Sequence, residues 1–226
     1  MDQSPLWHAL PPKRTLNLRG SRTIAIAGSG TTNKRFTATL AVSANGDKLK
    51  PMMIFAGTRD GRIATREFSA SPYRDRACLI CQSSGWQDKT NLLQWIDLIL
   101  VPYLQEKAQG APAVLMLDAF AAHHTESVKE RLEEIGVTLY QIPPGCTSLT
   151  QPIDVGLAKP VKDRYRAKWW AWYSGQNQDG PTFRTASREL CISWVVDIWE
   201  TLPASIVRNS WRKDGLSYFP DEEVER

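Results

Sequence analysis

Residues 112–120, PAVLMLDAF, decide the fold class because a continuous apolar run ends there in an acid. The run at 114–117 is typical of a strand buried on both faces of a parallel sheet, and Asp118 stands where that strand stops. The segments that follow, TESVKERLEEIG (125–136) and VTLYQIPPG (137–145), predict a helix and another short strand. Strand, helix and strand in this order predict a right-handed parallel unit.

Before this unit, the sequence predicts an antiparallel meander. The expected strands are TIAIAGSG (23–30), RFTATLAVSANG (35–46) and KLKPMMIFAG (48–57). Apolar side chains occupy every second position of the middle segment, which is the period of a strand with one buried face. The Asn45-Gly46 step that follows is a favoured hairpin turn.

The segment between the meander and the parallel unit predicts a loop, a strand and a helix. Residues 58–76 are rich in charge, Gly and Pro without a clear period, so we expect a surface loop. ACLICQ (77–82) predicts a short strand. GWQDKTNLLQWIDLILVPYL (85–104) predicts an amphipathic helix, with Asp88 or Thr90 as its N-cap.

The remainder of the chain predicts helices. Residues 148–173, SLTQPIDVGLAKPVKDRYRAKWWAWY, predict a helix in two pieces. Pro152 suits a first helical turn, and Pro160 starts or kinks the longer piece. A GQNQDGP linker follows, and residues 189–213 predict two short helices around Pro203.

Composition excludes several classes of protein. The 226 residues are 42% hydrophobic and 23% charged, which predicts one main domain with a buried core. The four cysteines are scattered apart from Cys78 and Cys81, so they predict neither a disulfide framework nor a four-ligand zinc site, and they favour a reducing compartment. No apolar run is long enough for a membrane span, and no signal peptide or basic run of five residues is present. The net charge of +4 suits a polyanionic partner without requiring one.

Two acids stand where a site is expected. Asp118 lies at the carboxyl end of a predicted parallel strand, where open sheets place their sites, although a turn or N-cap role is the commoner use of such an Asp. Asp154 lies in the first turns of the helix after the next strand and can return beside it. Adjacent carboxylates repel, and Mg²⁺ is the natural cation to hold them together. Asp2, taken alone, is only a solvated terminal charge.

Linked blocks of the sequence resemble pogo-type DDE/DDD transposases, which include the Tigger and jerky groups and the relatives of centromere-binding protein B. The second and third acidic blocks of that family resemble LMLDAFAAHHTESVKERL and IPPGCTSLTQPIDVGLAKPVKDRY. The first acidic block resembles the opening MDQSPLWHALPPKRTLNLRG, and RFTATLAVSANGDKLKPMMIF resembles the next two strands. SWVVDIWETLPASIVRNSWRKDGLS resembles the C-terminal helices, so the likeness covers nearly the whole chain.

The resemblance implies an α/β, RNase H-like mixed sheet flanked by helices, with further C-terminal helices. Carried over residue by residue, the catalytic and metal-binding acids of the family fall on Asp2, Asp118 and Asp154. The implied cofactor is Mg²⁺ or Mn²⁺, with two ions, and the implied reactions are DNA strand cleavage by water and strand transfer by a DNA 3′-hydroxyl. DNA is the implied partner and the nucleus the implied location. A homodimer is left open, and no membrane or small-molecule cofactor is expected.

Basic residues beside the third acid are candidate DNA contacts. Lys159, Lys162 and Arg166 recur at helical spacing and form a stripe, although a solvated helix face explains them equally well. His123, five residues after Asp118, is a candidate for contact with a phosphate or with a water near the metal. A structural role for this histidine is the alternative.

Two departures from the family pattern bear on activity. The first acid of the family ends a central strand, and because the chain begins one residue before Asp2 we expect that strand to be missing. We expect the family's helix-turn-helix region to be missing as well. We therefore expect an N-terminally truncated endonuclease domain at 1–174 and a linker with a C-terminal helical segment at 175–226. The alternative to an active enzyme is a domesticated or truncated remnant that binds DNA or acts as a scaffold without cleavage.

Overall fold

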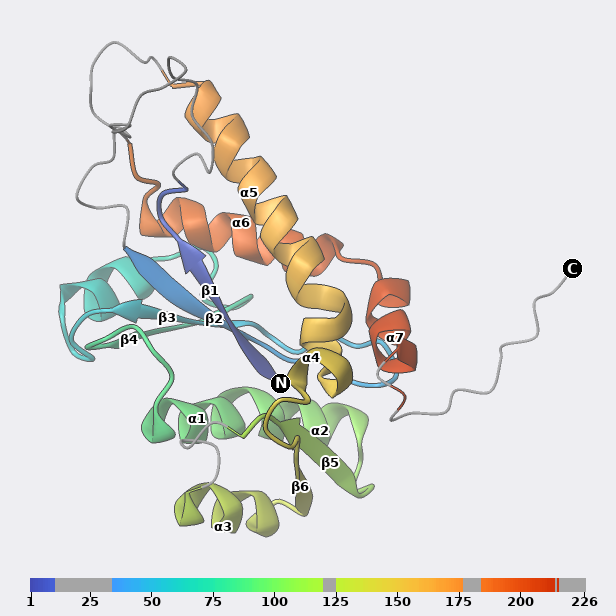
Figure 1. Cartoon of the computed structure of the whole chain (residues 1–226). Helices are drawn as coiled ribbons and strands as arrows, with labels where there is room; N and C mark the ends of the chain where they lie inside the picture. Colours follow the sequence, from blue (N-terminus) through green and yellow to red (C-terminus); the bar gives the residue numbers. More distant parts are fainter. Residues whose placement is uncertain (11–33, 120–124, 177–183, 214, 216–226) are drawn as a thin grey trace, which may run out of the picture.

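The computed structural model describes residues 1–10, 34–119, 125–176, 184–213 and 215. Within them the chain forms two sheets surrounded by helices (Figure 1), which confirms the mixed α/β class. The strand predicted at 23–30 and the candidate His123 lie outside the described residues.

The first sheet contains four strands in the order β1–β2–β3–β4. Their bounds are Asp2–Trp7 for β1, Arg35–Leu40 for β2, Met52–Ala56 for β3 and Cys78–Gln82 for β4. The first three strands pair antiparallel, and β4 adds parallel to β3. The hairpin between β2 and β3 turns at Gly46, whose φ of 98° is readily adopted only by glycine. The predicted Asn45-Gly46 turn is therefore confirmed.

β1 is a strand that the sequence analysis did not predict, and it differs from the family strand that was expected to be missing, which would end at the first acid. In the structure the strand starts at Asp2 and continues to Trp7, and it pairs with β2 along its whole length. The sequence DQSPLW concealed the strand because Ser4 and Pro5 interrupt its apolar pattern, although Ser4 is buried. Pro5 is tolerated because β1 is an outer strand of the first sheet.

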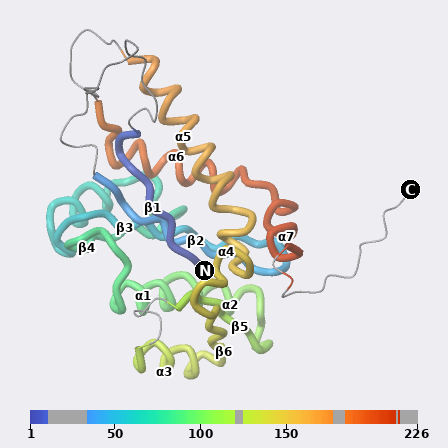
Figure 2. The backbone as a smooth tube through the Cα atoms, in the orientation of Figure 1, coloured from blue at the N-terminus to red at the C-terminus, as the bar shows by residue number. Residues whose placement is uncertain are grey.

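The second sheet is the predicted parallel unit. It consists of β5 (Ala113–Leu117) and β6 (Val137–Gln141), joined by α3 (Glu126–Glu134). Figures 1 and 2 show this unit beneath the first sheet, with the N-terminus of the chain between the two. The prediction of strand, helix and strand is confirmed.

A continuous helical segment connects the two sheets. It comprises α1 (Lys89–Trp95), the π-helical η2 (Ile96–Leu100) and α2 (Val101–Lys107). The Asp88 carboxylate accepts a hydrogen bond from the Asn91 backbone N–H at 2.8 Å, so Asp88 is the N-cap. The predicted loop at 58–76 is partly wrong, because it contains a helical turn, η1 (Ile63–Phe68), that buries Phe68 in the core.

The C-terminal half is helical, as predicted. The elements are α4 (Thr147–Thr150), the π-helical η4 (Ile153–Leu157), α5 (Ala158–Ser174), α6 (Arg188–Thr201) and α7 (Ala204–Lys213). Pro152 begins a helical piece as predicted, directly after the extended backbone of Gln151, and Pro160 lies in the first turn of the longer piece, α5. The two helices around Pro203 are α6 and α7.

The first sheet sends alternate side chains to two hydrophobic cores. Phe36 and Phe55 stack at 4.7 Å between ring centroids in the core shared with α5 and α6. Met52 and Ile54 point to the opposite face and pack with Trp95 of α1. Each of these side chains is at most 1% exposed, and full burial of a large apolar side chain contributes about 1.5 to 3 kcal/mol. The two cores therefore fix the sheet between two helical layers.

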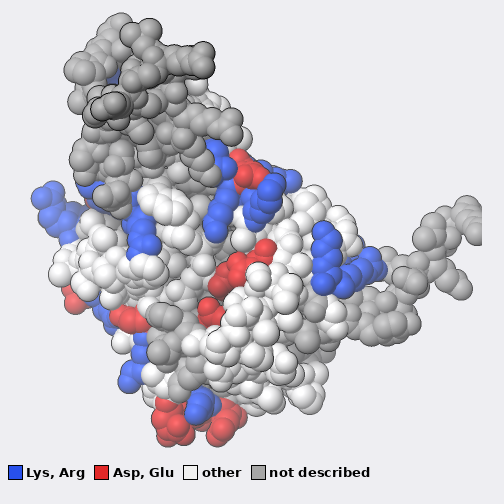
Figure 3. Space-filling view, viewed as in Figure 1, with Lys and Arg blue, Asp and Glu red and all other residues white. Residues whose placement is uncertain are grey.

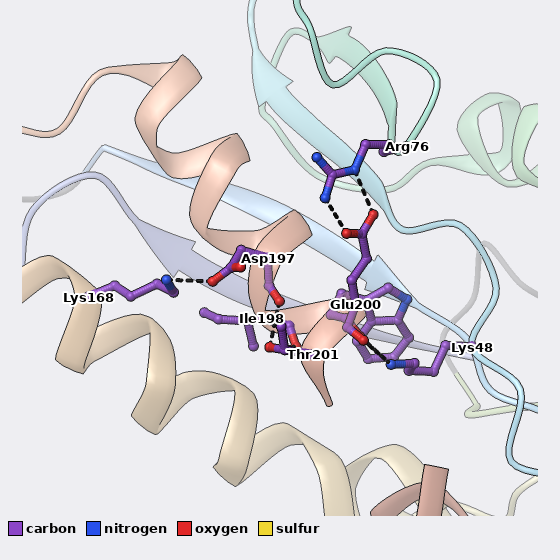
Figure 4. A network of polar contacts seen from close by, with 8 residues as sticks. Lys48, Arg76, Lys168, Asp197, Ile198, Glu200 and Thr201 are labelled. Atoms are coloured by element: carbon purple, nitrogen blue, oxygen red, sulfur yellow. Dashed lines mark hydrogen bonds and ion pairs between the residues drawn. The ribbon is translucent and has the colours of Figure 1, made fainter. Parts of the chain in front are cut away.

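Polar contacts hold the C-terminal end of α6 against the first sheet (Figure 4). The Lys48 ammonium donates to the backbone carbonyls of Trp199, Glu200 and Leu202 at 2.6, 2.9 and 2.6 Å. These carbonyls have no partner within the helix, and a cation there also opposes the negative end of the helix dipole. Arg76 adds a two-point ion pair with the Glu200 carboxylate. The hairpin after β2 is thereby joined to the C-terminal helices.

A helix that crosses a membrane must be both long and apolar. In the described ranges, no single helix is long and apolar enough to cross a membrane. α6 and α7 meet the test only as a pair bent by 77°, and much of α6 is buried in the core.

Candidate active site

Three elements distant in sequence place the three predicted aspartates at one site. Asp2 begins β1, and strand alternation puts its side chain on the same face as the buried Leu6, which packs toward α5. Asp118 directly follows β5 and is half-buried. Asp154 lies in the first turn of η4 and is exposed. The sequence analysis expected Asp118 and Asp154 to come together, and the family resemblance added Asp2. The three carboxyls act on one another electrostatically, while their role as metal ligands stays a prediction.

The carboxyl of Asp2 is the most strongly perturbed of the three. Burial, as the largest cause, and the negative charges of Asp154 and Asp118 together raise its pKa from 3.8 to about 6. A side-chain hydrogen bond joins Asp2 to Asp154. Two carboxyl groups can form such a bond only if one of them carries a proton, and protonated Asp2 is the donor. Below about pH 6 the proton therefore stays on Asp2, where it forms the hydrogen bond to Asp154.

Asp154 receives opposing influences. Desolvation raises its pKa, the nearby Lys162 ammonium lowers it, and the Asp118 carboxylate raises it again. Lys162 is thus the basic residue of α5 that acts directly on the acidic group. The positive charge of Lys162 attracts an anion that approaches the three carboxylates.

Carboxylate oxygens are the ligands that Mg²⁺ and Mn²⁺ prefer, so the donor set of the three aspartates fits a divalent ion. The mutual elevation of pKa shows a concentration of negative charge that a cation would neutralise. Across the described ranges, no group of three or more His, Cys, Asp or Glu side chains already has the arrangement needed to hold a metal ion. The three aspartates therefore fit a divalent ion in the chemistry of their oxygen donors.

Gln151 connects the segments that carry the acids, and the sequence analysis missed this role. Its buried side-chain amide donates to the Met1 carbonyl at 2.8 Å, directly before Asp2. The Met1 amino group in turn donates to the Met116 carbonyl at 3.0 Å, two residues before Asp118. These bonds tie β1 to β5 and to the turn before η4. In the sequence, the available signal for this role of Gln151 was a polar residue directly before the proline that starts a helix.

Close packing of η4 against α7 fixes the backbone around Asp154. A Cβ placed on Gly156 would lie 2.5 Å from the Cβ of Ser210, a distance that side chains do not tolerate. Ser210 is itself buried, and its hydroxyl donates to the Val207 carbonyl at 2.6 Å. Gly156 therefore permits α7 to lie directly on the turn that carries the third acid. A glycine inside a helical pattern was its only sequence signal.

The predicted basic stripe divides into two parts. Lys159 and Arg166 both pair with Asp163, at 3.0 and 3.1 Å, on the exposed face of α5. Such exposed pairs within one helix contribute little to stability and leave the cations accessible. Figure 3 shows acidic side chains in the middle of this face, near the N-terminus, with Lys and Arg side chains around them. The stripe lies beside the acidic group, while its contact with DNA stays a prediction.

Comparisons with known proteins match the chain to transposase-derived proteins. It is 26% identical over 228 residues to mouse "Pogo transposable element with KRAB domain", covering 98% of this chain and 36% of the mouse protein. It is 27% identical over 196 residues to human "Jerky protein homolog", covering 84% of this chain and 32% of that protein. The chain thus spans about a third of the length of these curated relatives.

One solved structure and one family model also match. The "Mos1 transposase paired-end complex with left transposon end" aligns with 95% of this chain and 54% of the Mos1 chain, at 13% identity and a TM-score of 0.48. The family model described as "DDE superfamily endonuclease" matches residues 33–211, which include Asp118 and Asp154 and exclude Asp2. Since the match spans most of its length, the chain belongs to the DDE superfamily of endonucleases.

Proposed function

We propose that this chain is the catalytic domain of a pogo-type transposase and cleaves DNA phosphodiesters with the help of divalent metal ions. The observation that carries the proposal is the meeting of Asp2, Asp118 and Asp154 at one site, with the pKa of Asp2 raised to about 6. Three acids that repel one another bring no benefit to the fold. They are useful where a cation is to be bound.

Each residue has a distinct role in this proposal. Asp2, Asp118 and Asp154 would hold the Mg²⁺ or Mn²⁺ ions. When bound, a pair of such ions neutralises charge on the attacking and leaving oxygens of a phosphoryl transfer. Lys162, which already acts on Asp154, would contact a DNA phosphate. Gln151 positions the first and third acids through Met1.

The site suits two related reactions. In cleavage, water attacks the phosphorus and the phosphodiester bond breaks. In strand transfer, a DNA 3′-hydroxyl replaces water as the nucleophile. Because the substrate in both reactions is DNA, the proposed location is the nucleus, and the proposed partner is duplex DNA bound along the basic side of α5.

Nicking of supercoiled plasmid tests the proposal. The intact chain is incubated with plasmid in Mn²⁺, Mg²⁺ or EDTA, and conversion to the relaxed form is measured. We expect metal-dependent nicking that falls at least about 100-fold in Asp118→Asn, in line with the loss of a group that stabilises the transition state. Asp163→Asn is the matched control, because Asp163 is an exposed acid on α5 and should be dispensable.

The same assay decides between the two candidate functions. If the wild-type chain nicks no better than Asp118→Asn in any metal, the catalytic proposal fails. A parallel gel-shift measurement then shows whether the protein still binds DNA, as the non-catalytic alternative requires. Equal loss of nicking in Asp163→Asn would also contradict the assignment of the site.

A further inference from the structure

An indole and a guanidinium stack on each other at the turn between β4 and α1. Trp86, in this turn, is 47% exposed and is the most exposed of the nine tryptophans, all of which lie in the described ranges. The guanidinium carbon of Arg35, the first residue of β2, lies 3.5 Å from the centre of the Trp86 ring. The turn is at the left of the molecule in Figure 1, where β4 continues into α1. The indole therefore offers aromatic surface to a ligand from solvent.

The backbone that carries this indole is fixed by buried polar side chains. The Thr37 hydroxyl donates to the Gly85 carbonyl at 2.8 Å, and the side-chain amide of Asn91 donates to the Trp86 carbonyl at 3.4 Å. Both Thr37 and Asn91 are buried. A Cβ on Gly85 would lie 3.1 Å from the Ala56 backbone nitrogen, so the turn packs closely on β3. An aromatic side chain on such a backbone loses little conformational entropy when it binds a ligand.

A second guanidinium lies beside the stack. Arg59 donates to the Asn91 side-chain oxygen at 3.2 Å, so the buried amide that holds the indole also holds this cation. Among the described residues, no carboxylate forms an ion pair with Arg35 or Arg59. The Asp88 carboxylate, at the end of the turn, already accepts from the Asn91 backbone N–H and from the Gln82 amide. The positive charge beside the indole is therefore available to an anion.

We propose that the stack of Arg35 and Trp86 binds an unpaired nucleobase of a DNA strand, while Arg59 contacts a phosphate of that strand. Indole and guanidinium planes both stack on the flat face that every base has. A nucleotide joins such a ring to an adjacent anion, which the second guanidinium attracts. Neighbouring bases cover both faces of a base inside a duplex, so only an unpaired base can stack here. The inference rests on the proposed function, because the strand belongs to the DNA substrate named there.

The stack lies apart from the three acids. Arg35 pairs with Trp7 at one end of the β1–β2 ladder, and Asp2 pairs with Leu40 at the other end. At the usual rise of a strand, Arg35 and Leu40 are about 17 Å apart along β2. Substitutions in the stack therefore leave the proposed metal ligands in place, so binding of an unpaired base and cleavage can be tested separately.

Fluorescence anisotropy tests the proposal on the intact chain, in EDTA so that no metal-dependent cleavage occurs. The probes are a labelled single strand of about 20 thymidines and a duplex of the same length. We expect Trp86→Ala to weaken single-strand binding at least about fivefold, because one base stack is lost, and to leave duplex binding unchanged. Trp86→Phe should restore most of the affinity. Leu98→Ala, which removes another exposed apolar side chain, is the matched control and should have no effect.

Two arginine variants separate stacking from charge. Arg35→Lys keeps the positive charge without the planar group, so it should weaken single-strand binding while the slope of log K against log salt stays the same. Arg59→Met removes a phosphate contact, so it should reduce that slope by about 0.7. A third measurement locates the base: ultraviolet light joins 5-iodouracil in the strand to an aromatic side chain that it touches, and mass spectrometry should find the product at Trp86.

Three results would overturn the inference. The first is single-strand binding that Trp86→Ala leaves unchanged, and the second is an equal loss of affinity for the single strand and the duplex. The third is crosslinking only at residues other than Trp86. Any of these with plasmid nicking intact would leave the proposed function standing. Loss of nicking alone, with single-strand binding that depends on Trp86, would overturn the catalytic proposal and leave this site in place.

Discussion

Replacement of Asp2 by Asn should stabilise the metal-free protein. Burial and the charges of Asp154 and Asp118 raise the pKa of Asp2 from 3.8 to about 6, so the folded state disfavours the ionised form. A shift of about 2 units corresponds to about 3 kcal/mol, because each unit is worth about 1.36 kcal/mol. Asn has nearly the same shape without the charge, and its amide can donate to Asp154 as protonated Asp2 does.

The sign of the effect gives it a defined pH dependence. A carboxyl whose pKa is higher in the folded state lowers stability as the pH rises from the unfolded to the folded value. The cost is absent below about pH 4 and complete above about pH 6. Asp2→Asn should therefore raise the free energy of unfolding by about 1 to 3 kcal/mol near pH 8 and leave it unchanged near pH 4.

Urea denaturation in EDTA at the two pH values measures this effect. Addition of Mg²⁺ should reverse the order of stability, since the ion stabilises only the form that binds it. Asp163→Asn serves as control, because Lys159 and Arg166 hold the pKa of Asp163 below its usual value, and its loss should not stabilise the fold. A gain in Asp2→Asn that is equal at both pH values, or no gain at all, would refute the reasoning.

Three further substitutions test the surroundings of the site. Gly156→Ala should destabilise the protein by about 1 to 3 kcal/mol in urea denaturation, because the new Cβ meets Ser210, and adding Ser210→Gly should restore much of the loss. Lys162→Ala should weaken DNA binding and reduce the slope of log K against log salt by about 1 in a fluorescence titration, with a smaller effect from Lys159→Ala, whose cation is paired with an acid. Lys48→Met should cost about 1.5 to 3 kcal/mol of thermal stability, since it leaves the last carbonyls of α6 without a donor.

Local sequence patterns were sufficient to predict those helices, strands and turns that are specified by residues close together in the chain. The apolar run of β5 and the helix after it predicted the parallel unit, and Asn45-Gly46 predicted the hairpin, because each signal lies within a few residues. β1 was not recognised, because its partner strand β2 begins only at Arg35 and its buried Ser4 reads as polar. The turn at Ile63–Phe68 was missed because a single apolar anchor, Phe68, fixes an otherwise polar stretch.

The residues of the candidate site also divide into those that the sequence could predict and those that it could not. Asp118 could be predicted from its place at the end of a strand and Asp154 from its place after the next strand, while Asp2 required the likeness to a known family. Gln151 and Ser210 could not be predicted, because their roles depend on contacts with residues 150 and 54 positions away. Such contacts exist only once the sheets and helices have packed.

The central claim is that Asp2, Asp118 and Asp154 together bind a divalent metal ion, and affinity cleavage tests it most directly. Fe²⁺ takes the place of Mg²⁺, ascorbate and peroxide generate hydroxyl radicals at the bound ion, and mass spectrometry locates the cuts in the polypeptide. The account predicts cuts near residues 2, 118 and 154 that excess Mg²⁺ suppresses and Asp118→Asn abolishes. Cuts elsewhere, or cuts that neither Mg²⁺ nor the substitution affects, would contradict it.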